Sequence, residues 1–304
     1  MNTPHANSGP AYERALEALR AELPEMAGVA EAFAALGRAS EEITGEASPW
    51  PPFTELDSEA FSEGSPLIAG LVDNAFVQLF QDSALAVLPA VARLFPAAAA
   101  QARTLGAALE EIPDLAAKGL KAVMASDPEA LAALAEQLGM DAPTLSFLLQ
   151  ECLRPCLRRA AAVLGKLADG DLWFKGHCPV CGSRPDLGTL KPKDNTSEYL
   201  VTKSGRLLLH CSMCSHEWRF VRLVCPACGQ EDHERLTVLT AEGRPERRIH
   251  VCQDCGRYLP VVDLSGEELP FHIDLAPFGM IPLEVLAQEQ GYKPLAWRPW
   301  NSFG

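Results

Sequence analysis

The sequence lacks the segments that would carry a chain to or through a membrane. Residues 1–26 have no basic start followed by an apolar run, which a signal peptide requires. The most apolar region, residues 83–111, is mainly alanine and is interrupted by Pro89, Arg93, Pro96 and Arg103, so no window holds the roughly 20 uninterrupted apolar residues of a membrane span. We therefore expect a cytoplasmic protein without membrane insertion, in a reducing compartment.

The common motifs of catalysis are also missing. There is no Gly-rich phosphate loop, no G-x-S-x-G elbow, no H-E-x-x-H and no convincing acid–base pair. His216 with Glu217 and His233 with Glu234 resemble fragments of catalytic motifs, and we interpret them as surface residues. The sequence therefore predicts that the protein is not an enzyme.

A basic face, which a nucleic-acid-binding protein normally shows, is not evident. The net charge is −14, and residues 1–170 account for −12 of it. Residues 171–260 have a net charge of +2 and residues 261–304 one of −4. This distribution argues against a nucleic-acid partner and assigns most of the acidity to the N-terminal half.

Cysteine is abundant, with ten residues in 304. In a small secreted chain such a number predicts a disulfide framework, but a chain of this length can bury an apolar core without cross-links. Eight of the ten lie in tight pairs, which favours metal binding in a reducing compartment. The other two, Cys152 and Cys156, share one face of an expected helix, and we interpret them as buried core residues.

The four cysteine pairs are CxxC turns at 178–181, 211–214, 225–228 and 252–255. Two residues between cysteines place both sulfur atoms on one side of a tight turn, and two such turns complete a tetrahedral four-sulfur site. Three of the turns are followed by a glycine, which tolerates the positive φ that such a turn needs. We predict eight metal ligands: Cys178, Cys181, Cys211, Cys214, Cys225, Cys228, Cys252 and Cys255.

The turns also form an internal repeat. The segments HCPVCG (177–182) and CPACG (225–229) each open a unit, and LHC (209–211) and HVC (250–252) each close one after an apolar strand. A duplicated module favours pairing of the first turn with the second and of the third with the fourth. Cross-braced pairing of the first turn with the third is the alternative. His177 and His210 flank ligand positions and are candidates either for hydrogen bonding around the sulfur atoms or for polar loop residues.

The expected fold is a multidomain α+β protein, in which an all-α bundle precedes two small four-cysteine β modules of rubredoxin-like or zinc-ribbon-like type. The predicted domains are an acidic helical domain (1–172), a first module (173–222), a second module (223–265) and a C-terminal helix and tail (266–304). Within the helical part we expect an irregular connection over 45–65, then a helix from Pro66 to Phe80, and a helix capped by Asp127. Short strands are expected at 207–210, 217–224, 235–239 and 247–251. The large aromatic residues near the modules and in the tail are Trp218, Tyr258, Trp297 and Trp300, and we expect most of them to pack in the core.

The ligand set by itself does not identify the metal. Four thiolates in a tetrahedron suit structural zinc, and the same set holds iron in a rubredoxin-type site. From the spacing alone we favour zinc.

An acidic helical region followed by two tandem four-cysteine modules resembles the FdhE family of formate dehydrogenase accessory proteins. All eight cysteine positions are present, and residues 1–65 contribute little to the likeness. The segments that carry it are PLIAGLVDN (66–74), HCPVCGSRP (177–185), LHCSMCSHEWRFVRLVCPACG (209–229) and CQDCGRYLPVVD (252–263).

The resemblance implies a cytoplasmic protein that supports the maturation of respiratory formate dehydrogenases and interacts with the catalytic subunit before export. It also implies that the modules are similar to rubredoxin and linked to iron, so it changes the expected metal from zinc to iron, one ion in each four-cysteine site. A rubredoxin-like electron-transfer protein is the alternative, and a zinc-ribbon nucleic-acid-binding protein is a weaker one.

Overall fold

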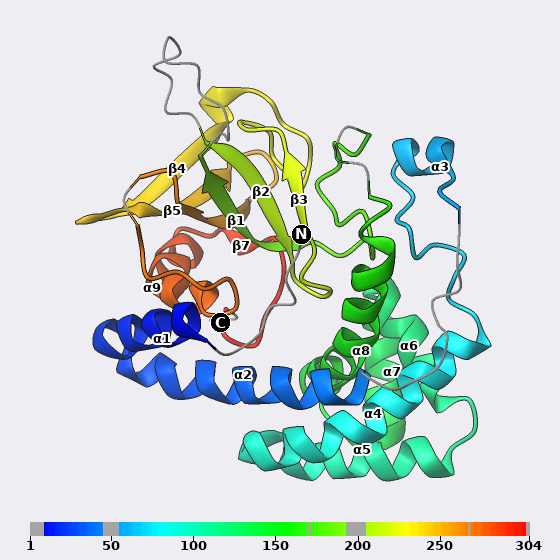
Figure 1. Ribbon diagram of the computed structural model, residues 1–304. Helices are drawn as coiled ribbons and strands as arrows, with labels where there is room; N and C mark the ends of the chain where they lie inside the picture. Colours follow the sequence, from blue (N-terminus) through cyan, green and yellow to red (C-terminus); the bar gives the residue numbers. More distant parts are fainter. Residues whose placement is uncertain are drawn as a thin grey trace. The chain divides into compact units, whose positions relative to one another are not determined.

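A computed structural model gives the fold for residues 9–44, 55–168, 170, 172–192, 205–266 and 268–301. The chain forms two compact units (Figure 1). Unit 1 contains Met1–Ala30, Leu56–Leu67 and Leu167–Gly304, and unit 2 contains Glu31–Glu55 and Ile68–Lys166. Each unit is described by itself below.

Unit 2 is helical throughout the part that the structure describes. Its helices are α4 (Asn74–Leu94), α5 (Ala99–Glu111), α6 (Leu115–Ala125), α7 (Pro128–Leu138) and α8 (Ala142–Leu164), with a short 3₁₀ turn, η1 (Pro96–Ala98), before α5. Residues of α2 (Pro24–Thr44) belong to both units. Aspartates begin three of these helices by accepting backbone N–H bonds, among them Asp127, which confirms the predicted start of α7.

One expected helix begins later than predicted. The sequence favoured a helix from Pro66, but residues 65–73 form turns and α4 starts at Asn74. The carboxylate of Asp73 accepts the Phe76 N–H at 3.0 Å, and Gly70 has a φ of +79° that ends any helix before it. In the connection predicted as irregular, residues 45–54 lie outside the described part, and Ser58–Glu63 form a short helix, α3, capped by Asp57.

The core of unit 2 surrounds α4 and α8. Cys152 and Cys156 are fully buried there, which confirms that they are core residues. Ser83 donates a hydrogen bond to the Cys152 carbonyl oxygen at 2.7 Å, and burial raises the pKa of the Cys156 thiol to about 12. Among the described helices, α4 is long and apolar enough to cross a membrane, but half of its most apolar stretch is buried inside the structure. We therefore read α4 as a core helix.

Unit 1 is built on one seven-stranded mixed sheet (Figure 1). Its strand order is β3-β2-β1-β6-β5-β4, and β7 also pairs with β6. The strands are β1 (Pro185–Lys191), β2 (Arg206–Cys211), β3 (Glu217–Phe220), β4 (Leu236–Ala241), β5 (Arg244–Cys252), β6 (Arg257–Asp263) and β7 (Lys293–Pro294), and a 3₁₀ turn, η2 (His233–Arg235), precedes β4.

Helix α9 (Ala276–Glu289) covers one face of this sheet. Its buried residues pack with a cluster from β1, β5 and β6 that includes Leu187, Ile249, Val251 and Tyr258. Helix α1 (Pro10–Glu22) also belongs to this unit, and the Tyr12 ring meets the His272 ring edge-on at 5.3 Å. The apolar alternation of β5 is thus explained by burial of one face under α9.

The two cysteine-rich segments are joined within the sheet. Strands β1–β3 come from the first predicted module and β4–β6 from the second. β1 and β6 pair in parallel, with Gly188, Thr189 and Leu190 opposite Val261, Val262 and Asp263. Consequently the sheet is continuous across position 222, at which the sequence predicted a domain boundary.

Candidate metal centres

The eight cysteines of the CxxC turns form two clusters of four. One contains Cys178, Cys181, Cys211 and Cys214, and the other Cys225, Cys228, Cys252 and Cys255. Within each cluster all sulfur atoms lie within 4.8 Å of one another. The structure therefore groups the first turn with the second and the third with the fourth, which is the sequential arrangement.

The sulfur separations fit a tetrahedral metal site. They are 3.5 Å for Cys178–Cys214 and 3.4 Å for Cys181–Cys211 in the first cluster. In the second cluster the Cys225–Cys255 and Cys228–Cys252 sulfur separations are both 3.7 Å. A metal–sulfur bond of about 2.3 Å gives a tetrahedron with edges of about 3.8 Å, whereas a disulfide bond measures about 2.0 Å. The donor set and its spacing therefore suit a single tetrahedral ion in each cluster.

All four turns share one backbone geometry. The residue after each second cysteine donates its N–H to the carbonyl oxygen of the first cysteine, at 2.9–3.2 Å. That residue has a positive φ in every case: +78° at Gly182, +59° at Ser215, +77° at Gly229 and +66° at Gly256. Other N–H groups point at sulfur, and Cys211 Sγ accepts from Met213 and from Cys214 at 3.4 Å. Such N–H donors stabilise the thiolate form that binds a metal.

Charge balance in the first cluster also favours a bound cation. Burial raises the pKa of Cys178 and of Cys214 well above the ordinary thiol value. Hydrogen bonds from the neighbouring thiols, chiefly Cys178, lower the pKa of Cys181 instead. Four sulfur atoms this close together, three of them on buried cysteines, cannot all ionise without a positive charge among them.

The clusters differ in their exposure. Cys178, Cys211 and Cys214 are buried and Cys181 is partly exposed. In the second cluster Cys228 is exposed and Cys255 is partly exposed. A metal in the second cluster would thus lie closer to solvent than one in the first.

No protein-family model matches the chain. The "Protein FdhE homolog" of Aquifex aeolicus is 29% identical to it over 154 residues, which cover 51% of each chain. The "Protein FdhE homolog" of Stutzerimonas stutzeri is 32% identical over 120 residues, 38% of this chain and 35% of that one. The crystal structure of the FdhE protein from Pseudomonas aeruginosa has the same fold, with a TM-score of 0.57 and 21% identity over 93% of this chain and 91% of that chain.

The chain is similar to proteins named FdhE homolog over the matched part of its length, and it has the fold of an FdhE protein. It spans about half the length of the Aquifex relative and about a third of the Stutzerimonas relative that it matches. The comparisons thereby bear out the resemblance to FdhE proteins that the sequence indicated.

A network of buried polar side chains surrounds the first cluster, and most of this network was not predicted from the sequence. His210 Nδ1 and Asp186 Oδ1 lie 2.8 Å apart, and both side chains are buried. Burial favours the neutral ring, but the Asp186 carboxylate raises the pKa of His210. Arg298 reaches the same carboxylate at 3.3 Å and donates to the carbonyl oxygen of Ser212, inside the second turn, at 2.8 Å. The contacts of Asp186 and Arg298 with this network are visible only in the folded structure. No sequence motif links either residue to a cysteine pair.

The histidines and glutamates that the sequence analysis singled out lie in different environments. His177 Nε2 donates to the Gly64 carbonyl oxygen at 3.0 Å. His233 and Glu234 are exposed, as expected, whereas His216 and Glu217 are half-buried and Glu217 pairs with Lys191 at 3.1 Å.

Among the large aromatic residues, Trp218 and Tyr258 are buried, Trp300 packs on Phe278 at 4.5 Å, and Trp297 is 39% exposed.

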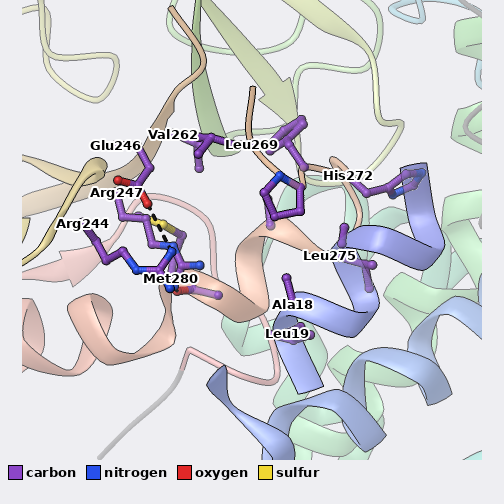
Figure 2. Close-up of a pocket in the computed structure, with 15 residues that line it drawn as sticks. Ala18, Leu19, Arg244, Glu246, Arg247, Val262, Leu269, His272, Leu275 and Met280 are labelled. Atoms are coloured by element: carbon purple, nitrogen blue, oxygen red, sulfur yellow. Dashed lines mark hydrogen bonds and ion pairs between the residues drawn. The ribbon is translucent and has the colours of Figure 1, made fainter. Parts of the chain in front are cut away.

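A separate pocket lies away from both clusters, between α1, β5 and α9 (Figure 2). Arg244, Arg247 and Glu246 line one side of it and His272 lies on the other. The two guanidinium groups already bind the Glu22 carboxylate, with Arg247 at 2.6 Å. Their charge is balanced within the chain, so this pocket offers no free cation to an anionic ligand.

Proposed function

We propose that the protein is a cytoplasmic accessory protein, without catalytic activity of its own, that formate dehydrogenase needs in order to become active. In this proposal it binds the catalytic subunit before export and acts in its maturation. The observation that carries the proposal is the pair of four-sulfur clusters on one sheet, in a chain whose relatives are FdhE proteins. Membrane insertion and nucleic-acid binding have no part in it.

Each cluster is proposed to hold one iron ion through its four cysteines, two ions in total, with zinc as the alternative. The family resemblance favours iron, whereas the sulfur geometry suits both metals equally. An iron ion bound by four thiolates can accept and release one electron, and zinc cannot. In each site the polypeptide holds four cysteine sulfur atoms at tetrahedral spacing and directs backbone N–H groups at them.

The domain arrangement is proposed to follow the sequence pattern. In it residues 1–172 form a helical bundle, 173–222 and 223–265 form two rubredoxin-like or zinc-ribbon-like modules, and 266–304 form a C-terminal helix and tail. The similar turns in the two modules support this division.

Metal analysis of the purified chain tests the proposed cofactor. We expect two iron ions per chain and visible sulfur-to-iron charge-transfer absorption when the protein is purified without oxygen. Changing Cys225 and Cys228 to serine removes one ion, and the matched pair Cys152→Ala with Cys156→Ala retains both. Two zinc ions and no colour contradict the iron assignment and leave two structural sites.

Deletion of the gene tests the proposed role. We expect formate oxidation to be lost while the dehydrogenase polypeptide is still made. The wild-type gene restores activity, and the serine double variant does not if the second site is functional. Unchanged formate oxidation in the deletion strain refutes the maturation role.

An electron-transfer protein is the second candidate function. The exposure of Cys228 favours it, because a surface sulfur brings a redox metal close to a partner. A reversible one-electron transition, together with normal dehydrogenase activity after deletion, distinguishes this candidate from a maturation role.

A further inference from the structure

Three of the four CxxC turns accept a hydrogen bond at the same backbone position from a segment distant in sequence. The acceptor is the carbonyl oxygen of the residue that follows the first cysteine. The donor and acceptor pairs are Leu67 N–H with the Pro179 oxygen at 2.8 Å, Arg298 Nη1 with the Ser212 oxygen at 2.8 Å, and Arg184 Nη1 with the Pro226 oxygen at 3.3 Å. These turns are therefore held from outside their own cysteine pairs.

The Ser212 carbonyl belongs to a peptide group that also bonds a cysteine sulfur. In a trans peptide the C=O and the following N–H lie in one plane and point in opposite directions. At one end of this peptide the Ser212 oxygen accepts from Arg298. At the other end the Met213 N–H donates to Cys211 Sγ at 3.4 Å. Because the peptide is rigid, Arg298 fixes the direction of the N–H group that faces the sulfur.

The Arg298 side chain is itself held in one orientation. It is only 12% exposed, its Nε lies 3.3 Å from Asp186 Oδ2, and its guanidinium carbon lies 4.5 Å from the centre of the Trp300 ring. Asn301 Oδ1 accepts the Arg298 N–H at 2.8 Å, and Asn301 Nδ2 donates to the Ala296 carbonyl oxygen at 3.1 Å. The last two bonds close residues 295–301 into a loop, which we call the C-terminal loop.

The C-terminal loop is attached to the sheet and to α9. Leu295 N–H donates to the Tyr258 carbonyl oxygen on β6 at 3.0 Å. Gln288 Nε2 on α9 donates to the Asn301 carbonyl oxygen at 2.7 Å, and Asn301 is only 4% exposed. The loop is thus a fixed part of this compact unit, and it places a charged donor at the second turn.

The second turn is the one in which such a bond matters most. It has Ser215 after its second cysteine, with a φ of +59°, where the other three turns have glycine. A residue with a side chain is disfavoured in this left-handed region, so the turn is strained and depends more on bonds from outside. In the third turn the donor is the exposed Arg184, and its bond to Pro226 is longer.

We propose that Arg298 is a positioning residue of the first metal site and that the C-terminal loop thereby controls how fast this site releases its metal. Arg298 acts through the Ser212–Met213 peptide, which it holds so that the N–H bond to Cys211 is kept. This inference deepens the proposed function and rests on the part of it that assigns metal to the clusters.

Release of cobalt(II) from the full-length chain tests the proposal. Cobalt is the probe because it takes tetrahedral thiolate sites and its sulfur-to-metal absorption reports on the bound sulfur atoms. Release to a chelator is followed in the wild-type chain and in the full-length chain with Cys225→Ser and Cys228→Ser, which keeps only the first site. We expect Arg298→Ala to speed release from the first site about tenfold or more and to leave the second site unchanged.

A second variant and a spectrum separate positioning from folding. Arg298→Lys keeps a positive charge beside Asp186, but one ammonium group cannot serve both Asp186 and Ser212 as the guanidinium does. It is expected to fold and still to release cobalt faster than wild type. In both variants the sulfur-to-cobalt band of the first site should move to longer wavelength, because a sulfur that loses an N–H donor gives up charge more easily. Circular dichroism verifies the fold.

Two further arginines provide controls. Arg206→Ala removes an exposed arginine at the start of β2, the strand that leads into the second turn, and is expected to change neither site. Arg184→Ala removes the equivalent donor of the third turn and is expected to speed release from the second site only.

Three outcomes overturn the proposal. They are a folded Arg298→Lys chain that releases cobalt at the wild-type rate, equal acceleration of both sites by Arg298→Ala, and equal effects of Arg298→Ala and Arg206→Ala. A wild-type chain that binds no cobalt refutes the metal centres, and this inference with them. If formate oxidation survives deletion of the gene, the maturation role fails while the release result stands. If only the release result fails, the proposed function stands without a role for Arg298.

Discussion

At the scale of single residues, the four CxxC turns differ in one position that matters for stability. Three of them have glycine in the left-handed conformation, and the turn at 211–214 has Ser215 there, with a φ of +59°. A side chain in this region is unfavourable by about 1 kcal/mol, which glycine avoids. The first cluster is therefore built with one strained turn.

Ser215→Gly is expected to raise the free energy of unfolding by about 1 kcal/mol, because it removes that strain. Gly229→Ser, at the equivalent place in the second module, is expected to lower it by a similar amount. Urea denaturation of the metal-loaded variants measures both. Equal stability of the two variants contradicts the shared turn geometry.

Gly176 is tied to the second cluster by close contact. A Cβ atom there would lie 1.9 Å from the Pro226 carbonyl oxygen, and Pro226 stands between Cys225 and Cys228. Gly176→Ala is expected to destabilise the protein by about 1–3 kcal/mol and to loosen the metal of the second site, because the third turn must move. Thermal unfolding and metal content measure the two effects. Gly266→Ala, at a position with open space around it, is the control, and an equal response of the two variants contradicts the contact.

The sequence allowed the residues of the clusters to be predicted, because CxxC spacing is a local signal. The tandem repeat also indicated how the four turns combine. The polar network around the first cluster could not be predicted from the sequence. Asp186 contacts His210, and Arg298 contacts Asp186 and Ser212, only after the sheet and the C-terminal tail have folded together. Whether the eight cysteines bind metal remains a prediction.

At the scale of elements, α9 is held on the sheet by a buried polar contact. Glu284 is only 2% exposed, and its Oε1 lies 3.3 Å from Tyr258 Oη on β6 and from Asn301 Nδ2 in the tail. Burial raises the pKa of Glu284 to about 7, with the negative charge of Asp186 acting in the same direction. The folded protein therefore binds this proton more tightly than the unfolded chain does.

Glu284→Gln is expected to change the dependence of stability on pH. The ordinary pKa of this group is 4.5, so its contribution favours folding at low pH and is lost as the pH rises from about 4.5 to about 7. The difference in unfolding free energy between wild type and Glu284→Gln should change by about 3 kcal/mol between pH 5 and pH 8. Urea denaturation at both pH values measures it. Glu289→Gln, on the exposed side of α9, is the control, and identical pH profiles of wild type and Glu284→Gln refute the shift.

The strands show where local patterns fail as predictors. Four strands were expected from apolar runs, and the structure contains β2, β3, β4 and β5 at those places. β1 and β6 were missed, because Pro185, Gly188 and Pro260 weaken their local strand signal. Their strand form depends on each other, since both lie at the centre of the sheet and pair in parallel over a long sequence separation.

At the scale of the whole molecule, the two clusters belong to one sheet but differ in their access to solvent. The second cluster contains the exposed Cys228, and the first is largely buried. If both hold metal, a chelator should remove the two ions in separate phases, the second site first. The release is measured as the increase in absorbance of a chromogenic chelator when it binds the divalent metal. The faster phase is expected to be absent from the variant with serine at 225 and 228, and a single phase in wild type contradicts the difference in access.

The parallel pairing of β1 with β6 has a consequence for synthesis on the ribosome. Leu190 finds its partner Asp263 only after the whole second module has been made, and α1 belongs to the same compact unit as residues 167–304. Until then β1 has an open edge that another strand could occupy. The first cysteine cluster, by contrast, is complete once Cys214 has left the exit tunnel. Metal binding by that cluster during synthesis would therefore keep β1 paired with β2 until β6 has been made and can pair with β1.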